Sequence, residues 1–216
     1  MSLFTGIKSV ISPQTIETAT SNYNGRIMVD YYCFRYRIIV GGFWQSGQYA
    51  KATIRRALNG FTRTDIKSIL LLGVGGGSMA QFLHERFPQA QITGVEIDPM
   101  MIELAKKYFG LGNWRYLNVI IADAADYIRR YYGKDAFDMV VSDVFVGCDR
   151  PESLDSHDHI RGIFRVLNPG GIYITNCSYL PAYRKASDRY LSRVRSVFSG
   201  VEIIKSYPNF LVRAYK

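Results

Sequence analysis

Four short segments of the sequence end in residue types that can bind a nucleoside and hold a reacting group. The first ends in the glycine-rich run from Gly73 to Gly77, where missing side chains let the backbone turn sharply and approach a ligand. Glu96 ends the second segment, at a spacing that suits a carboxylate accepting hydrogen bonds from both ribose hydroxyls. Asp123 and Asp143 end the third and fourth segments. A carboxylate can accept from an adenine amino group at the third position and orient an amine at the fourth.

Two of these features have a second interpretation. A glycine run of the form G-x-G-x-x-G with a later acid is also the dinucleotide fingerprint, but Ser78 stands in the place of its third glycine. Asp123 can also cap the helix that starts with AADYIRR, and this role is compatible with a ligand contact. The sequence therefore favours a pocket for a nucleoside, and a dinucleotide is the second interpretation.

Apolar segments alternating with amphipathic helices must position these residues. A basic helix near residues 183–198 and two β-rich segments at the C-terminus predict a final helix and an antiparallel hairpin. The predicted fold class is α/β, with a doubly wound, mostly parallel seven-stranded sheet of the class I methyltransferase-like Rossmann type. The expected parallel strands are SILLLGV, QITGVEI, LNVIIA, FDMVVSD and IYITN, with helices MAQFLHERF, PMMIELAKKYF, DAADYIRRYY and HIRGIFRVL between them.

A smaller β element is expected before this sheet. Residues 24–43 are rich in β-branched and aromatic side chains and are bounded by Asn-Gly and Gly-Gly, which predicts a two-stranded hairpin. A helix is expected over residues 47–58, ending at Asn59-Gly60. The predicted division is a small N-terminal β element with a linking helix over residues 1–62 and an α/β domain over residues 63–216.

The composition limits the class of protein further. The chain has 216 residues, 48% of them hydrophobic, and a formal net charge of +9. The lack of a secretory pattern or a long apolar stretch predicts a soluble, cytoplasmic protein that does not enter a membrane. The positive charge makes RNA a possible partner, which is not favoured because the arginines are scattered. Three widely spaced cysteines, and two histidines (His157 and His159) without other placed ligands, predict no metal site.

The sequence resembles the spermidine synthase-like family, the polyamine aminopropyltransferases, within the class I S-adenosylmethionine-dependent methyltransferase superfamily. The segments LLLGVGGGS, VEIDPMMIELAKKYF and IIADAADYI, and the strand ending VVSD, carry this resemblance in order and spacing. The resemblance implies S-adenosylmethionine or its decarboxylated form as donor, with S-adenosylhomocysteine or methylthioadenosine as product and no metal. It also implies a small-molecule substrate, expected to be an amine, and a homodimer.

Residue roles follow from the same resemblance. Asp143 would lie beside the attacking amine with Tyr49, and the loop after it offers Asp149 and Glu152 to a cationic substrate. The residues implied to bind the nucleoside are Gln45, Gly73, Gly75, Gly77, Glu96, Ile97, Asp123 and Ala124.

Two departures from the family pattern leave three functions open. Val146 replaces the second acid after the fourth strand, and Lys51 stands where the family has an acid. The favoured function is aminopropyl transfer to a diamine or polyamine. The alternatives are methyl transfer to an unknown acceptor, for which an RNA would depend on Arg184, Arg189 and Arg193, and a non-catalytic nucleoside-binding module.

Overall fold

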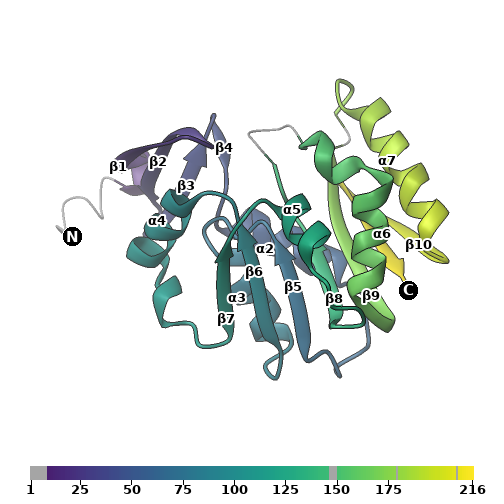
Figure 1. The fold of residues 1–216 in the computed structure, drawn as a ribbon. Coiled ribbons are helices and arrows are strands. Elements are labelled where there is room, and N and C mark those ends of the chain that lie inside the picture. Colours follow the sequence, from purple (N-terminus) through teal and green to yellow (C-terminus); the bar gives the residue numbers. More distant parts are fainter. Residues whose placement is uncertain (1–8, 146–149, 179, 208) are drawn as a thin grey trace.

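Two β-sheets organise the molecule, shown in a computed structural model that describes residues 9–145, 150–178, 180–207 and 209–216, apart from the side chains of Gln48 and Tyr49. The small sheet is antiparallel, with order β1-β2-β3-β4. The large sheet has seven strands in the order β10-β11-β9-β8-β5-β6-β7. In Figure 1 the small sheet lies beside one end of the large one, above helix α4.

The large sheet confirms the predicted fold class. Strands β5 to β9 are parallel, and β11 is antiparallel to both β9 and β10. The strands are β5 (Ser68–Leu72), β6 (Gln91–Glu96), β7 (Leu117–Ile121), β8 (Phe137–Ser142), β9 (Leu167–Ser178), β10 (Gly200–Ser206) and β11 (Asn209–Tyr215). The helices are α2 (Gln48–Ala57), α3 (Ser78–Arg86), α4 (Pro99–Phe109), α5 (Ala124–Arg130), α6 (His157–Val166) and α7 (Arg184–Val197), with short 3-10 turns η1 (Leu111–Asn113) and η2 (Glu152–Asp155).

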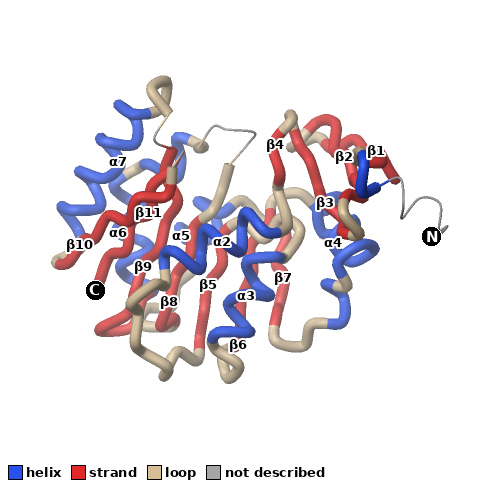
Figure 2. Tube along the Cα trace, turned by 180° about the vertical axis from the view of Figure 1, so that it is seen from behind, coloured by secondary structure: helices blue, strands red, loops and turns tan. Residues whose placement is uncertain are grey.

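Alternate side chains of the central strand fill two separate cores, as expected for a sheet covered on both faces. Leu70 and Leu72 pack with α5, α6 and α7, whereas Ile69 and Leu71 pack with α2 and α3. Figure 2 shows α2 and α3 together on the face that is turned away in Figure 1. The linking helix α2 therefore packs on the large sheet.

The small sheet is larger than the predicted hairpin. Strands β2 (Gly25–Tyr32) and β3 (Arg35–Val40) pair as expected, but β1 (Gln14–Ser21) and the two-residue β4 (Phe43–Trp44) extend them on either side. The prediction missed β1 because its sequence, QTIETATS, is mostly polar and has no fully buried residue. The apolar face formed by Ile27, Val29, Ile38 and Val40 packs on Met101 and Leu104 of α4.

Candidate nucleoside and acceptor site

A cavity of about 470 Å³ opens where the parallel strands of the large sheet end at their carboxyl termini. The ends of β5, β6 and β8 form its floor, and the turn between β1 and β2 and strand β4 form part of its wall. Its surface is mainly apolar, with polar side chains placed among the apolar ones, as is usual for small-molecule sites. The predicted site residues that line it are Gln45, Gly73, Gly75, Glu96, Ile97, Asp123, Ala124 and Asp143.

The glycine loop is shaped by close backbone contacts. A Cβ atom on Gly73 would lie 2.6 Å from the carbonyl oxygen of Asp143, and one on Gly75 would lie 2.8 Å from that of Gln45. Both glycines also have positive φ, which larger residues adopt only with strain. Gly77 has a structural role in the described residues, and its predicted ligand contact stays a prediction. It caps α3 in the left-handed conformation, against the Trp114 ring, and does not line the pocket.

Glu96 is held by three backbone amides. Its Oε2 accepts hydrogen bonds from Val74 and Gly75, at 3.1 and 2.9 Å, and its Oε1 accepts one from Asp98 at 3.1 Å. Burial raises the pKa of this carboxyl, and the three amides oppose that change. Oε1 accepts only one of these bonds, so it keeps acceptor capacity for a ribose hydroxyl.

Asp123 caps a helix and also lines the pocket, as both interpretations of its position require. Its Oδ1 accepts from the backbone amide of Asp126 at 2.8 Å, which makes it the N-cap of α5. It also lines the pocket beside Ala124. The capping role is therefore observed, and contact with an adenine stays a prediction.

Asp143 lies at the end of β8, on the pocket wall with Val144 and Phe145. Its Oδ1 accepts a hydrogen bond from the side-chain amide of Asn176, 2.9 Å away at the end of β9. Burial raises the pKa of Asp143, while this hydrogen bond and the charge of Arg150 lower it. A carboxylate with a raised pKa is suited to taking a proton from an amine that is losing one.

The small sheet reaches the pocket through Gln45 and through the turn carrying Tyr23 and Asn24. The buried Asp98 fixes this turn, because its Oδ2 accepts from Ser21 Oγ at 2.5 Å and from Asn24 Nδ2 at 2.6 Å. The Asp98 Oδ1 caps α4 by accepting from Met100 at 3.0 Å. One carboxylate thus joins the start of α4 to the small sheet.

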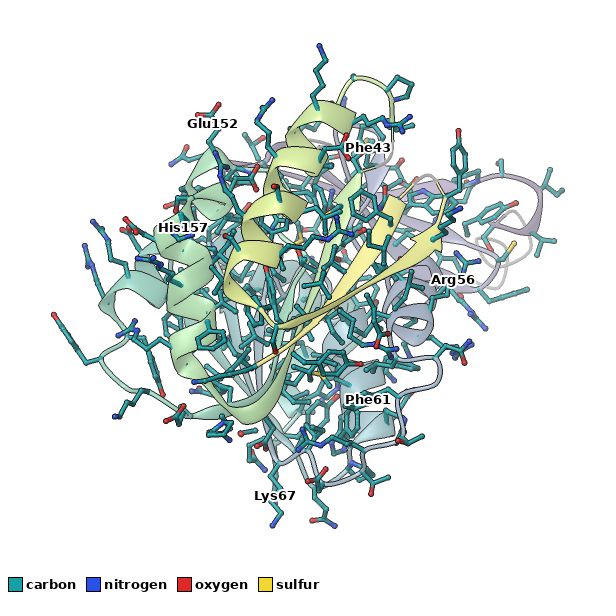
Figure 3. The ribbon with its side chains drawn as sticks, turned by 90° about the vertical axis from the view of Figure 1, so that its right-hand side faces the viewer. Phe43, Arg56, Phe61, Lys67, Glu152 and His157 are labelled. Atoms are coloured by element: carbon teal, nitrogen blue, oxygen red, sulfur yellow. The ribbon has the colours of Figure 1, made fainter. Side chains whose placement is uncertain are left out.

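The predicted acidic substrate loop does not converge on the pocket within the described residues. Glu152 is exposed in η2 and points to solvent in Figure 3. Asp155 pairs with Arg150 at 2.9 Å. The side chain of Tyr49 and the whole of Asp149 and Val146 lie outside the described residues.

Sequence reasoning missed a buried polar group behind Asp143. Arg150 packs over the Tyr190 ring at 3.9 Å and donates to the side chain of Thr175 and the carbonyl of Asn176 at 2.9 and 3.1 Å. The sequence did contain a signal for Asn176, because this residue ends the predicted strand IYITN, just as the other site residues end theirs. Nothing in the sequence marks the arginine in a loop as buried. Among the described residues, no cluster of His, Cys, Asp and Glu could hold a metal ion.

Comparisons with known proteins agree with this geometry. A methyltransferase-domain family model matches residues 69–171. An eEF1A lysine and N-terminal methyltransferase homolog of Drosophila melanogaster is 36% identical over 118 residues, which cover 51% of this chain and 17% of that protein. A polyamine aminopropyltransferase of Chromobacterium violaceum is 32% identical over 148 residues, covering 67% of this chain and 55% of the relative.

A probable spermidine synthase from Corynebacterium glutamicum has the same fold, with a TM-score of 0.77 and 20% identity over 92% of this chain and 79% of its own. The strand order and these matches identify a fold of the class I S-adenosylmethionine-dependent methyltransferase type, with a methyltransferase-domain match over residues 69–171. The resemblance to the spermidine synthase-like family, which the sequence indicated, is confirmed by the matched polyamine aminopropyltransferase, and the solved structure shares the fold of this chain. The chain spans only part of the curated relatives' length. Among the described helices, none has the length and apolar content needed to cross a membrane.

Proposed function

We propose that the chain transfers a methyl group from S-adenosylmethionine to a single amine nitrogen held at Asp143. The observation that carries the proposal is the small number of carboxylates at the pocket. Of the three that line it among the described residues, Glu96 is bound to the glycine loop and Asp123 caps a helix. Asp143 alone is left for cationic groups.

Aminopropyl transfer demands more negative charge than this. The decarboxylated donor ends in an ammonium group, and a diamine acceptor carries a second ammonium beyond its attacking nitrogen. Each buried ammonium needs a partner, because an unpaired charge is costly to remove from water. The wall near Asp143 offers the apolar side chains of Phe145, Leu154 and Leu180 instead.

The start of α3 supports a donor with a carboxylate. Ser78 and Met79 line the pocket at the N-terminus of this helix, where backbone N–H groups and the helix dipole favour an anion. The methionine tail of S-adenosylmethionine carries such a carboxylate, and the decarboxylated tail does not.

The residues fit a simple alkyl transfer. When bound, the nucleoside supplies an electrophilic carbon on its sulfonium. The neutral amine attacks that carbon, the C–S bond breaks with its electron pair on sulfur, and the nitrogen becomes positively charged. Asp143 stabilises that charge and can accept the proton that the nitrogen then releases, with Asn176 holding the carboxylate in place.

Aminopropyl transfer, which the sequence favoured, remains the second candidate. The match to a polyamine aminopropyltransferase supports it. The matches to relatives named eEF1A lysine and N-terminal methyltransferases support methyl transfer to an amine. Homodimer formation and a cytoplasmic location stay predictions.

Calorimetric titration with S-adenosylmethionine and, separately, its decarboxylated form tests the proposal. We expect tighter binding of S-adenosylmethionine, and we expect Asp143→Asn to keep that binding while losing methyl transfer to amines. Tighter binding of the decarboxylated nucleoside, with spermidine formed from putrescine, would establish aminopropyl transfer instead. Binding of neither nucleoside would contradict both methyl transfer and aminopropyl transfer.

A further inference from the structure

A second hollow, of about 640 Å³, lies beside the nucleoside pocket. Trp44 and Ser78 line both cavities, so they form the wall between them. The hollow is bounded by the β2–β3 turn, β3, the beginning of α2 and the end of α4. An occupant of the hollow would therefore lie next to the mouth of the nucleoside pocket.

The hollow is positively charged. Arg35, Arg37 and Lys51 line it, and no aspartate or glutamate does among the described residues. In the part of the chain that the structure describes, neither arginine forms an ion pair, and Lys51 pairs with the half-exposed Glu85 at 3.3 Å. Exposed pairs of this kind contribute little to stability, so Lys51 can exchange its partner.

Arg37 is held in place by aromatic rings. Its guanidinium carbon lies 4.5 Å from the centre of the Tyr32 ring and 5.1 Å from that of Trp44. Its Nε is buried and has no hydrogen-bond partner. A cation fixed on two rings is pre-organised for a carboxylate, because it loses little freedom on binding.

We propose that this hollow binds acidic residues of a polypeptide whose amine enters the neighbouring pocket. The proposal rests on the proposed methyl transfer, and it names the acceptor class as a polypeptide with carboxylates near a lysine or N-terminal amine. The excess positive charge of the chain suits such a partner. A single-stranded nucleic acid is disfavoured, because the Arg37 guanidinium covers one face of the Tyr32 ring and one face of the Trp44 ring, and those faces cannot stack on bases.

The aromatic rings at the border of the nucleoside pocket suit a lysine side chain. Phe43 and Trp44 are exposed at the pocket mouth, and Asp143 lies within the same pocket. A long aliphatic stem can pass such apolar rings while its neutral amine reaches the carboxylate. Flanking carboxylates would then reach the cations of the hollow.

Fluorescence anisotropy with labelled short peptides tests the proposal. One peptide has a central lysine flanked by glutamates, a second has glutamines in their place, and a short oligouridylate is the nucleic-acid probe. The variants are Arg35→Glu and Lys51→Glu. Lys67→Glu is the matched charge reversal, because Figure 3 shows Lys67 at the opposite end of the molecule from Phe43.

We expect the acidic peptide to bind the wild type and Lys67→Glu equally and each hollow variant at least tenfold more weakly. Methyl incorporation into that peptide should fall through a higher KM, with kcat little changed. Equal binding of the glutamine peptide, tighter binding of the oligouridylate, or an effect below twofold in both variants would overturn the proposal. Titration with S-adenosylmethionine is run on the same samples. Loss of that binding alone would refute the proposed transfer and leave the peptide site standing.

Discussion

The side-chain amide of Asn176 donates to Oδ1 of Asp143 across 2.9 Å, joining the ends of two neighbouring parallel strands. This is the only described side chain that hydrogen-bonds to the carboxylate placed beside the proposed acceptor. The amide stabilises the ionised form, and it lowers a pKa that burial raises.

Asn176→Ala should therefore make Asp143 harder to ionise. If ionised Asp143 is required, activity rises with pH through its pKa, so the acidic limb of the kcat/KM profile moves to higher pH. A hydrogen bond to a charged group is worth about 1.5 kcal/mol, so we expect roughly tenfold lower kcat/KM on the acidic side. The alkaline plateau should change little.

A pH–rate series on Asn176→Ala and Asn209→Ala checks this. Asn209 also lines the pocket, and its replacement removes an amide that is not the described hydrogen-bond partner of Asp143. An unmoved acidic limb in Asn176→Ala, or an equal loss of rate at every pH, would contradict the assigned role.

Glu96→Gln should weaken nucleoside binding. The carboxylate accepts from three backbone amides, and an amide side chain would turn an NH₂ group toward at least one of them. Loss of charged hydrogen bonds costs about 1.5–3 kcal/mol each, so affinity for S-adenosylmethionine should fall at least tenfold. Calorimetry on Glu96→Gln and on Glu103→Gln, an exposed acid of α4, measures the difference. An affinity within twofold of the wild type would exclude Glu96 as the ribose ligand.

Much of the pocket was predictable because parallel strands bring their carboxyl ends to one edge. Gly73, Glu96, Asp123 and Asp143 needed only correct strand boundaries to be placed together. Gly77 is the N-cap of α3, a role the sequence did not reveal, because a glycine run does not show which member turns toward a ligand and which starts the helix.

Some contacts that the sequence did not reveal join residues far apart along the chain. The turn at Asn24 was visible as Asn-Gly, but its docking depends on a buried carboxylate far along the chain. The loop after Asp143 is rich in acidic residues, and one of them, Asp155, pairs with Arg150 because that buried guanidinium needs a counter-charge. The spacing of residues along the sequence does not show which polar side chains will pair in the folded protein.

Asp98→Ala should destabilise the fold and loosen the pocket wall. The substitution removes the N-cap of α4 and leaves Asn24 and Ser21 without their acceptor. Loss of an N-cap costs about 1 kcal/mol, and each unsatisfied polar group costs a similar amount. We therefore expect the free energy of unfolding, measured in urea, to fall by about 2–3 kcal/mol.

A double-mutant cycle with Asn24→Ala separates the two effects of this change. If Asp98 joins the sheet to the helix, the double variant should lose clearly less stability than the sum of the two single variants. Strict additivity would mean that Asp98 acts only as a helix cap.

His159 offers a test of the buried polar group behind Asp143. It is 4% exposed, neither ring nitrogen has a hydrogen-bond partner, and burial followed by the charge of Arg150 lowers its pKa from 6.5 to about 3. The unfolded chain takes up a proton below pH 6.5, whereas the folded protein does not until about pH 3. The folded state therefore loses stability relative to the unfolded state as pH falls through that window, by about 1.4 kcal/mol per pH unit at most.

His159→Leu should remove this loss while filling a similar volume. We expect the variant to gain stability over the wild type as pH is lowered from 7 to 5 in urea unfolding, because other titrating groups contribute equally to both proteins and cancel in the difference. His157→Leu is the matched control on the same helix, since His157 is partly exposed and its Nε2 lies 3.3 Å from Ser196 Oγ. A stability difference independent of pH would show that His159 takes up its proton at the same pH in the folded and the unfolded protein, and the neutral, buried imidazole would have to be abandoned.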